Sequence, residues 1–122
     1  MPKRILIVDD EPDLLEMVQI NLEMEGYECI VAYDGFRGFE RARKEKPDLI
    51  ILDVMLPGMN GYKVCRLLKF DEKFKHIPII MLTAEAQEKD RQTGQETGAD
   101  FYMTKPFSAD KLLAKVKEYL GE

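Results

Sequence analysis

The fold is decided by the stretch Leu49-Ile50-Ile51-Leu52-Asp53-Val54-Met55-Leu56-Pro57-Gly58-Met59-Asn60-Gly61. It opens with four consecutive apolar residues, passes through Asp53 into a turn-forming loop, and is followed by apolar residues at helical spacing from Val64 to Leu68. A short strand that is apolar at every position is typical of a parallel sheet covered on both faces. The stretch therefore predicts one strand-loop-helix unit of an α/β domain.

The same unit recurs along the rest of the chain. Strands are predicted at residues 5–8, 27–32, 49–52, 79–82 and 101–103, and helices at about 12–24, 36–46, after Gly61 and after Ser108. Gly26 and Pro47 should end the first two helices. Phe36, Phe39 and Ala42 are expected to face inward. The pattern predicts a doubly wound parallel sheet between two layers of helices.

Residues 87–97 depart from this pattern, because QEKDRQTGQET contains no hydrophobic residue. A helix there would have little to bury and would be marginally stable. An exposed connection explains the composition equally well.

Composition restricts the class of protein. A chain of 122 residues with 45% hydrophobic and 34% charged residues suits one folded domain. Its net charge of −5 argues against direct binding to nucleic acid or to an anionic membrane surface. No apolar run approaches the length of a membrane span, and we expect a cytoplasmic protein. Cys29 and Cys65 are expected to be buried, reduced thiols, and His76 to lie on the surface.

Polar residues follow four of the five predicted strands: Asp9 and Asp10, then Asp53, Thr83 and Lys105. Ligands bind at the carboxyl ends of parallel strands, so the carboxylates would converge if the first and third strands are neighbours, as in the order 2-1-3-4-5. Because clustered carboxylates repel one another, Mg²⁺ and Lys105 are the natural cations to hold them together. Asp53 could then act as a nucleophile toward phosphorus, with Thr83 donating to a phosphoryl oxygen.

Each of these residues also has a purely structural interpretation. Asp9 and Asp10 could form turns, Thr83 could cap a helix, and Lys105 before Pro106 could be a surface residue. Asp53 fits that interpretation less well, because Pro57-Gly58 and Asn60-Gly61 already supply the turn residues of its loop. The presence of all these residues at the ends of the predicted strands favours a functional site over separate structural roles.

Four blocks of sequence carry a resemblance to a known family. They are Ile7-Val8-Asp9-Asp10-Glu11, Leu52-Asp53-Val54-Met55-Leu56-Pro57-Gly58-Met59-Asn60-Gly61, Leu82-Thr83-Ala84 and Thr104-Lys105-Pro106-Phe107. In this order and at these separations they resemble the receiver domain of two-component response regulators, over essentially the whole chain. The resemblance implies one receiver domain over residues 1–122, with a flavodoxin-like (βα)5 three-layer sandwich and a parallel sheet of order 2-1-3-4-5.

The resemblance also implies roles for individual residues. Asp53 would be the phosphorylation site, and Asp9, Asp10, Asp53 and the carbonyl of Met55 would hold Mg²⁺. Thr83 and Tyr102 would be the switch residues, and Lys105 the ion-pairing lysine. The Lys105–Pro106 bond would be cis.

Such a domain would take a phosphoryl group from the phosphohistidine of a sensor histidine kinase or of a phosphotransfer protein. It would catalyse its own phosphorylation and later hydrolysis, and it would switch the surface of its fourth helix, fifth strand and fifth helix toward an effector or its own output domain. No output domain follows Glu122, so either a single-domain regulator or an excised receiver is expected. A phosphorylation-dependent homodimer is left open, because Phe101 and Glu85 depart from the dimer face of winged-helix regulators.

Three other functions are compatible with an α/β domain of this kind. A flavin or nucleotide binder would need a phosphate-binding loop after the first strand, where Asp9-Asp10-Glu11-Pro12 stands instead. An aspartate-dependent phosphatase would have a second acid at Met55. A receiver-shaped interaction module that works without phosphorylation is the main alternative, although all the expected site residues are retained.

Overall fold

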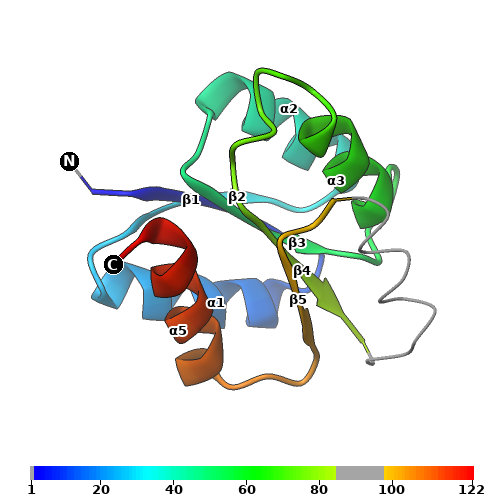
Figure 1. Cartoon of the computed structure of the whole chain (residues 1–122). Coiled ribbons are helices and arrows are strands. Elements are labelled where there is room, and N and C mark those ends of the chain that lie inside the picture. The colour runs from blue at the N-terminus through cyan, green and yellow to red at the C-terminus, as the bar shows by residue number, and fades with distance from the viewer. Residues whose placement is uncertain (1, 85–97) are drawn as a thin grey trace.

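Five parallel strands form one sheet in the order β2-β1-β3-β4-β5 (Figure 1). The computed structural model describes residues 2–84 and 98–122. The strands are β1 (Arg4–Val8), β2 (Glu28–Ala32), β3 (Leu49–Asp53), β4 (Ile79–Thr83) and β5 (Phe101–Thr104). The doubly wound, flavodoxin-like fold and the order 2-1-3-4-5 are confirmed. The predictions for residues 87–97 and for Glu85 lie outside the described residues.

Helices cover both faces of the sheet. They are α1 (Pro12–Met24), α2 (Gly35–Glu45), α3 (Gly61–Lys69) and α5 (Ala109–Leu120). Figure 1 shows α1 and α5 on one face and α2 and α3 on the other. The side chains of Asp34, Asn60 and Ser108 accept hydrogen bonds from the backbone at the starts of α2, α3 and α5, which satisfies amide groups that have no partner within the helix. None of the described helices is long and apolar enough to cross a membrane.

The core has two parts because successive side chains of a strand point to opposite faces of the sheet. Leu6 and Ile50 pack toward α2 and α3, whereas Ile7 and Ile51 pack toward α1 and α5. All of the central strands β1, β3 and β4 are buried apart from Arg4. Their carboxyl ends therefore occupy fixed positions, on which the site is built.

The inward orientation expected of Phe36 is wrong, because its side chain is 62% exposed. The glycines of α2 explain the difference. A Cβ atom on Gly38 would lie 2.7 Å from Cγ1 of Val8, and one on Gly35 would lie 1.6 Å from the carbonyl oxygen of Met59. The helix thus docks closely through Gly35, Gly38 and Ala42, which leaves Phe36 outside the contact. Cys29 is only half-buried, whereas Cys65 is buried and His76 is exposed, as expected.

One partly buried lysine joins α3 to the starts of two strands. Nζ of Lys69 donates to the carbonyl oxygens of Lys75 and Ile77 at 2.8 and 3.0 Å, and to Oδ2 of Asp100 at 2.8 Å. The same carboxylate oxygen accepts from the backbone N–H of Ile79 at 2.8 Å. This network fixes the beginnings of β4 and β5 relative to α3.

Candidate functional site

Three carboxylates meet at the carboxyl ends of β1 and β3. Asp9 and Asp10 follow β1 directly, Asp53 is the last residue of β3, and β1 and β3 are neighbours in the sheet. One carboxylate oxygen of each residue lies within 4.8 Å of those of the other two. Asp9 and Asp53 are buried and Asp10 is exposed. The strand-end prediction therefore placed these three residues together correctly.

Lys105 reaches this cluster from the end of β5. Its Nζ atom lies 3.2 Å from Oδ2 of Asp9 and 3.4 Å from Oδ2 of Asp53. It also lies 3.0 Å from Oε1 of Glu11, a residue to which the sequence assigned no role. Glu11 is the N-cap of α1 but makes no side-chain cap hydrogen bond, so its carboxylate is left to pair with the lysine. Only its place next to Asp10 in the sequence could have signalled this contact.

Burial controls the ionisation of the site. It raises the pKa of Asp53 to about 6, and the negative charge of Asp9 adds to the increase, while Lys105 and the N–H of Met55 oppose it. Burial likewise raises the pKa of Asp9. Burial opposes the charge of Lys105, but the hydrogen bond to Glu11 and the charges of Asp53 and Asp9 outweigh it and raise the pKa of the lysine. Among residues 2–84 and 98–122, the site therefore sets the three carboxyl groups of the cluster against one ammonium group, that of Lys105.

The loop after β3 is fixed by its backbone. The N–H of Val54 donates to the carbonyl oxygen of Leu82 at 2.9 Å, and the N–H of Gly61 to that of Val54 at 2.8 Å. A Cβ atom on Gly61 would lie 2.1 Å from the carbonyl oxygen of Asp53, so only glycine fits there. The N–H of Met55 faces Oδ1 of Asp53 at 3.4 Å, and the side chain of Met55 is exposed at the edge of the site.

Thr83 ends β4, between the strands that carry Asp53 and Lys105. The register pairs Leu82 with Asp53, so Thr83 lies one residue beyond that pair, and its side chain is buried. Its carbonyl oxygen accepts from the N–H of Lys105 at 2.6 Å. Tyr102 is half-buried on β5, and the Lys105–Pro106 bond is cis, as the resemblance implied.

The donor set of the acidic cluster fits a hard divalent cation. Asp9, Asp10 and Asp53 offer only carboxylate oxygens, and Mg²⁺ is bound in proteins by one or two carboxylates together with water and phosphate oxygen. The exposed Asp10 leaves one side of the cluster open to solvent. The cluster is therefore consistent with Mg²⁺ binding.

A comparison with protein families decides the identity. The model of the response regulator receiver domain matches residues 5–117. The chain belongs to this family. Receiver domains are components of two-component signal transduction, and the resemblance stated from the sequence is thereby confirmed.

Curated relatives of this receiver domain are longer regulators. It is 48% identical over 117 residues to the DNA-binding dual master transcriptional regulator RpaA of Synechocystis sp. PCC 6803, covering 96% of this chain and 48% of that protein. It is 49% identical over 120 residues to the alkaline phosphatase synthesis transcriptional regulatory protein PhoP of Bacillus subtilis, covering 98% of this chain and 49% of that protein. The chain thus spans about half the length of these relatives.

Solved receiver structures share the fold over the whole chain. A putative response regulator from Chloroflexus aurantiacus superposes with a TM-score of 0.94 at 37% identity, covering 100% of both chains. The receiver domain of a sensor histidine kinase from Pseudomonas aeruginosa PAO1, also covering 100% of both chains, superposes with a TM-score of 0.91 at 30% identity. That structure has a magnesium ion coordinated in its active site cleft.

Proposed function

We propose that this receiver accepts a phosphoryl group on Asp53 from the phosphohistidine of a sensor histidine kinase or of a phosphotransfer protein. The observation that carries the proposal is the placement of Lys105 Nζ at 3.4 Å from Asp53 Oδ2, beside the carboxylates of Asp9 and Asp10. Residues 1–122 would form a single receiver domain. We place it in the cytoplasm because the relatives named above regulate transcription.

The reaction is an in-line transfer between two nucleophiles. A carboxylate oxygen of Asp53 attacks phosphorus, the new O–P bond forms as the P–N bond of the phosphohistidine breaks, and the imidazole leaves with the electron pair of that bond. Because the pKa of Asp53 is about 6 without metal, most of this carboxylate is already ionised at neutral pH. The domain would in this way catalyse its own phosphorylation.

Two groups of this chain would stabilise the negative charge that the phosphoryl group brings. The ammonium of Lys105 lies within reach of both buried carboxylates, and the hydroxyl of Thr83 would donate to a phosphoryl oxygen. Asp9, Asp10, Asp53 and the carbonyl of Met55 would hold Mg²⁺, which supplies charge neutralisation and orientation to the phosphoryl oxygens when bound.

The exposed side chain of Met55 would restrict the approach of water to the aspartyl phosphate, so that self-hydrolysis is slow.

Phosphorylation would be transmitted from the site through Thr83 and Tyr102. Movement of the Thr83 hydroxyl toward the phosphoryl group would let Tyr102 turn inward and alter the surface of β5 and α5. A few kcal/mol of difference between two conformations is enough to reverse their populations. The altered surface would then act on an effector or output domain, or form a homodimer.

A receiver-shaped module that works without phosphorylation is not favoured, since the acidic cluster and its lysine are all present.

Phosphorylation by a small donor tests the proposal. We expect acetyl phosphate and Mg²⁺ to add one phosphoryl group to the wild-type chain, measured by intact mass, and none to Asp53→Asn. Asp13→Asn, which removes an exposed carboxylate from the first turn of α1, is the matched control and should be modified like wild type. Wild-type modification of Asp53→Asn would refute the assignment.

A further inference from the structure

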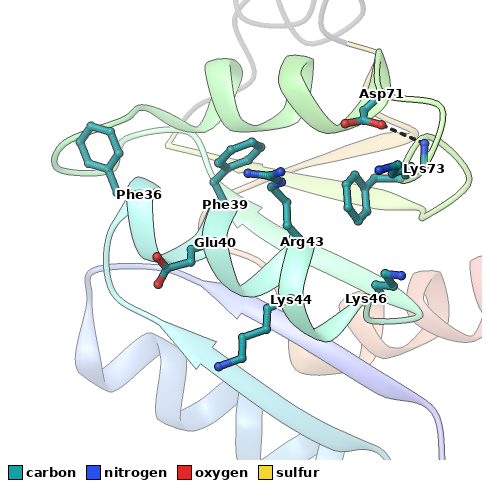
Figure 2. A pocket seen from close by; sticks show the side chains of 9 residues that line it. Phe36, Phe39, Glu40, Arg43, Lys44, Lys46, Asp71 and Lys73 are labelled. Carbon is teal, nitrogen blue, oxygen red and sulfur yellow. Dashed lines mark hydrogen bonds between the residues drawn. The ribbon is translucent and has the colours of Figure 1, made fainter.

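A second surface of the molecule, which shares no residue with the acidic cluster, combines exposed aromatic and basic side chains. A pocket of about 670 Å³ lies between α2 and the turn that follows α3. Phe36, Phe39 and Phe74 supply its apolar wall, and Arg43, Lys44 and Lys46 come from the last turn of α2 and the residue that ends it. Figure 2 shows Phe39 and Arg43 side by side, with Asp71 and Lys73 across the pocket from them.

The surface continues onto the outer side of α3. Asp71 and Lys73 also line a second hollow, of about 820 Å³, together with Leu67 and Phe70. Phe36, Leu67 and Phe70 are 62%, 40% and 70% exposed. We call the two hollows together the α2–α3 groove. Exposed apolar side chains that gather at one place, with polar groups around them, mark a site of interaction.

The groove is basic although the chain as a whole is acidic. Its two hollows are lined by six basic side chains against three acidic ones, in a chain whose net charge is −5. The six basic residues are Arg43, Lys44, Lys46, Lys63, Arg66 and Lys73. Over residues 2–84 and 98–122, none of the six makes an ion pair within 4.0 Å, whereas Arg37 and Arg41 on α2 pair with Asp34 and Glu45. The groove therefore presents positive charge that the described part of the chain does not neutralise.

The helix dipole explains the positions of only some of these six basic residues. Arg43, Lys44 and Arg66 lie in last turns, where a positive charge is favourable, but Lys63 lies in the first turn of α3, where it is not. Lys46 has a left-handed backbone, with φ of 48°, at the C-terminal end of α2, a conformation that glycine adopts more easily. A purely structural role does not explain a lysine at either position.

The two arginines of the groove are held in place by aromatic rings. The guanidinium carbon of Arg43 lies 5.4 Å from the ring centroid of Phe39, and that of Arg66 lies 5.7 Å from the ring centroid of Phe70. A guanidinium stacked on a ring keeps the N–H groups of its edge available, and that edge matches a carboxylate in a two-bond geometry. The groove thus offers two oriented carboxylate-binding groups beside the apolar side chains of its two hollows.

We propose that the α2–α3 groove binds an acidic peptide segment of a partner protein. Carboxylates of the segment pair with Arg43 and Arg66, and its aromatic or aliphatic side chains pack against Phe36 and Phe70. A nucleic acid fits less well, because Glu40, Asp71 and Glu72 interrupt the basic residues and would repel a continuous phosphate backbone. The carboxylates of a peptide are separate groups, so they can contact the basic side chains without lying against these three acids. The inference does not depend on phosphorylation of Asp53.

Selection from a display library of random 12-residue peptides tests the proposal. The wild-type chain is the bait, and the enriched peptides are afterwards tested for binding to the double variant Arg43→Gln, Arg66→Gln. We expect enriched peptides that carry several Asp or Glu residues together with Phe, Tyr, Trp or Leu. Failure to enrich such peptides, or enrichment of peptides that bind the double variant equally well, would overturn the proposal.

A selected peptide, resynthesised, then allows the contribution of each group to be measured. Arg43→Gln with Arg66→Gln should weaken its binding at least tenfold. Lys46→Gly should weaken binding while leaving thermal stability equal or higher, because glycine is favoured at that backbone angle. Arg41→Gln is the matched control, since Arg41 lies on α2 but is already paired with Glu45, and it should bind like wild type.

Further measurements distinguish an acidic peptide from the other possible ligands of the α2–α3 groove. Amide chemical-shift changes on peptide binding should map to α2, α3 and residues 70–75. Shifts confined to α1 or to β5 and α5 would overturn the assignment of the surface. Equal binding of a single-stranded oligonucleotide of the same charge would point to nucleic acid instead. Self-association in sedimentation that the double variant abolishes would point to a second copy of this chain.

Discussion

Replacing the proposed phosphoacceptor should make the metal-free protein more stable. Asp53 is 4% exposed and lies beside the buried carboxylate of Asp9, with Nζ of Lys105 3.4 Å from its Oδ2. Its pKa is raised from 3.8 to about 6 by burial and by the charge of Asp9. The folded state therefore favours the protonated form, which Asp53→Asn imitates at every pH. We expect this variant to have the higher free energy of unfolding at pH 7.

The size and the pH range of this gain in stability follow from the raised pKa of Asp53. A carboxyl whose pKa is higher in the folded state contributes its full stability below the unfolded value near 3.8, and loses it as the pH rises through about 6. A change of roughly two pKa units corresponds to about 3 kcal/mol. Asp53→Asn should thus gain about 3 kcal/mol over wild type at pH 7 and close to nothing at pH 4.

Urea unfolding in EDTA at pH 4 and pH 7 measures both values, with Asp13→Asn as the control for loss of an exposed carboxylate. Added Mg²⁺ should reverse the order at pH 7, because it binds the folded wild-type cluster and stabilises it by mass action. A stability of Asp53→Asn that is unchanged or lower than that of wild type at pH 7, or a gain that persists at pH 4, would show that charge repulsion does not control this site.

Three further predictions concern other parts of the molecule. Asp10→Asn should abolish stabilisation by Mg²⁺ and raise metal-free stability by less than Asp53→Asn, because Asp10 is exposed to water; a metal-free melting temperature well below that of wild type would make Asp10 a structural turn residue. Met55→Asn should speed loss of the phosphoryl group, because a polar side chain at this edge admits water, and an unchanged dephosphorylation rate would remove Met55 from the mechanism. Lys69→Met should lower the free energy of unfolding by about 2 kcal/mol, because it removes the lysine donor of two carbonyl oxygens and leaves Asp100 with only the N–H of Ile79 among these donors; a loss below 0.5 kcal/mol in urea unfolding would contradict this.

The elements that carry the site could be predicted because their signals are local. A strand such as residues 49–52, apolar at every position, must be buried on both faces, and this alone indicates a parallel sheet with helices on each side. Once the sheet is parallel, Asp9, Asp53 and Lys105 must end at the same edge. Their convergence therefore followed from the order of strands without any knowledge of side-chain geometry.

The contacts that could not be predicted depend on close approach or on distant partners. Phe36 is exposed because α2 docks through its glycines, and hydrophobic spacing cannot distinguish a glycine that lines a contact from one that ends a helix. Glu11 reaches Lys105 across 94 positions of sequence, and Lys69 reaches Asp100 across 31. Neither pairing has a local signal, since a charged residue on a helix surface is ordinarily solvated.

The most direct test of the account is to locate the phosphoryl group on the chain. The protein is phosphorylated with acetyl phosphate and Mg²⁺, the acyl phosphate is reduced with borohydride, and the modified residue is identified by peptide mass spectrometry. We expect Asp53 alone to be converted to homoserine, because Asp53 combines Lys105 at 3.4 Å with the neighbouring carboxylates of the metal cluster. Conversion of Asp9, Asp10 or any other carboxylate in its place would contradict it.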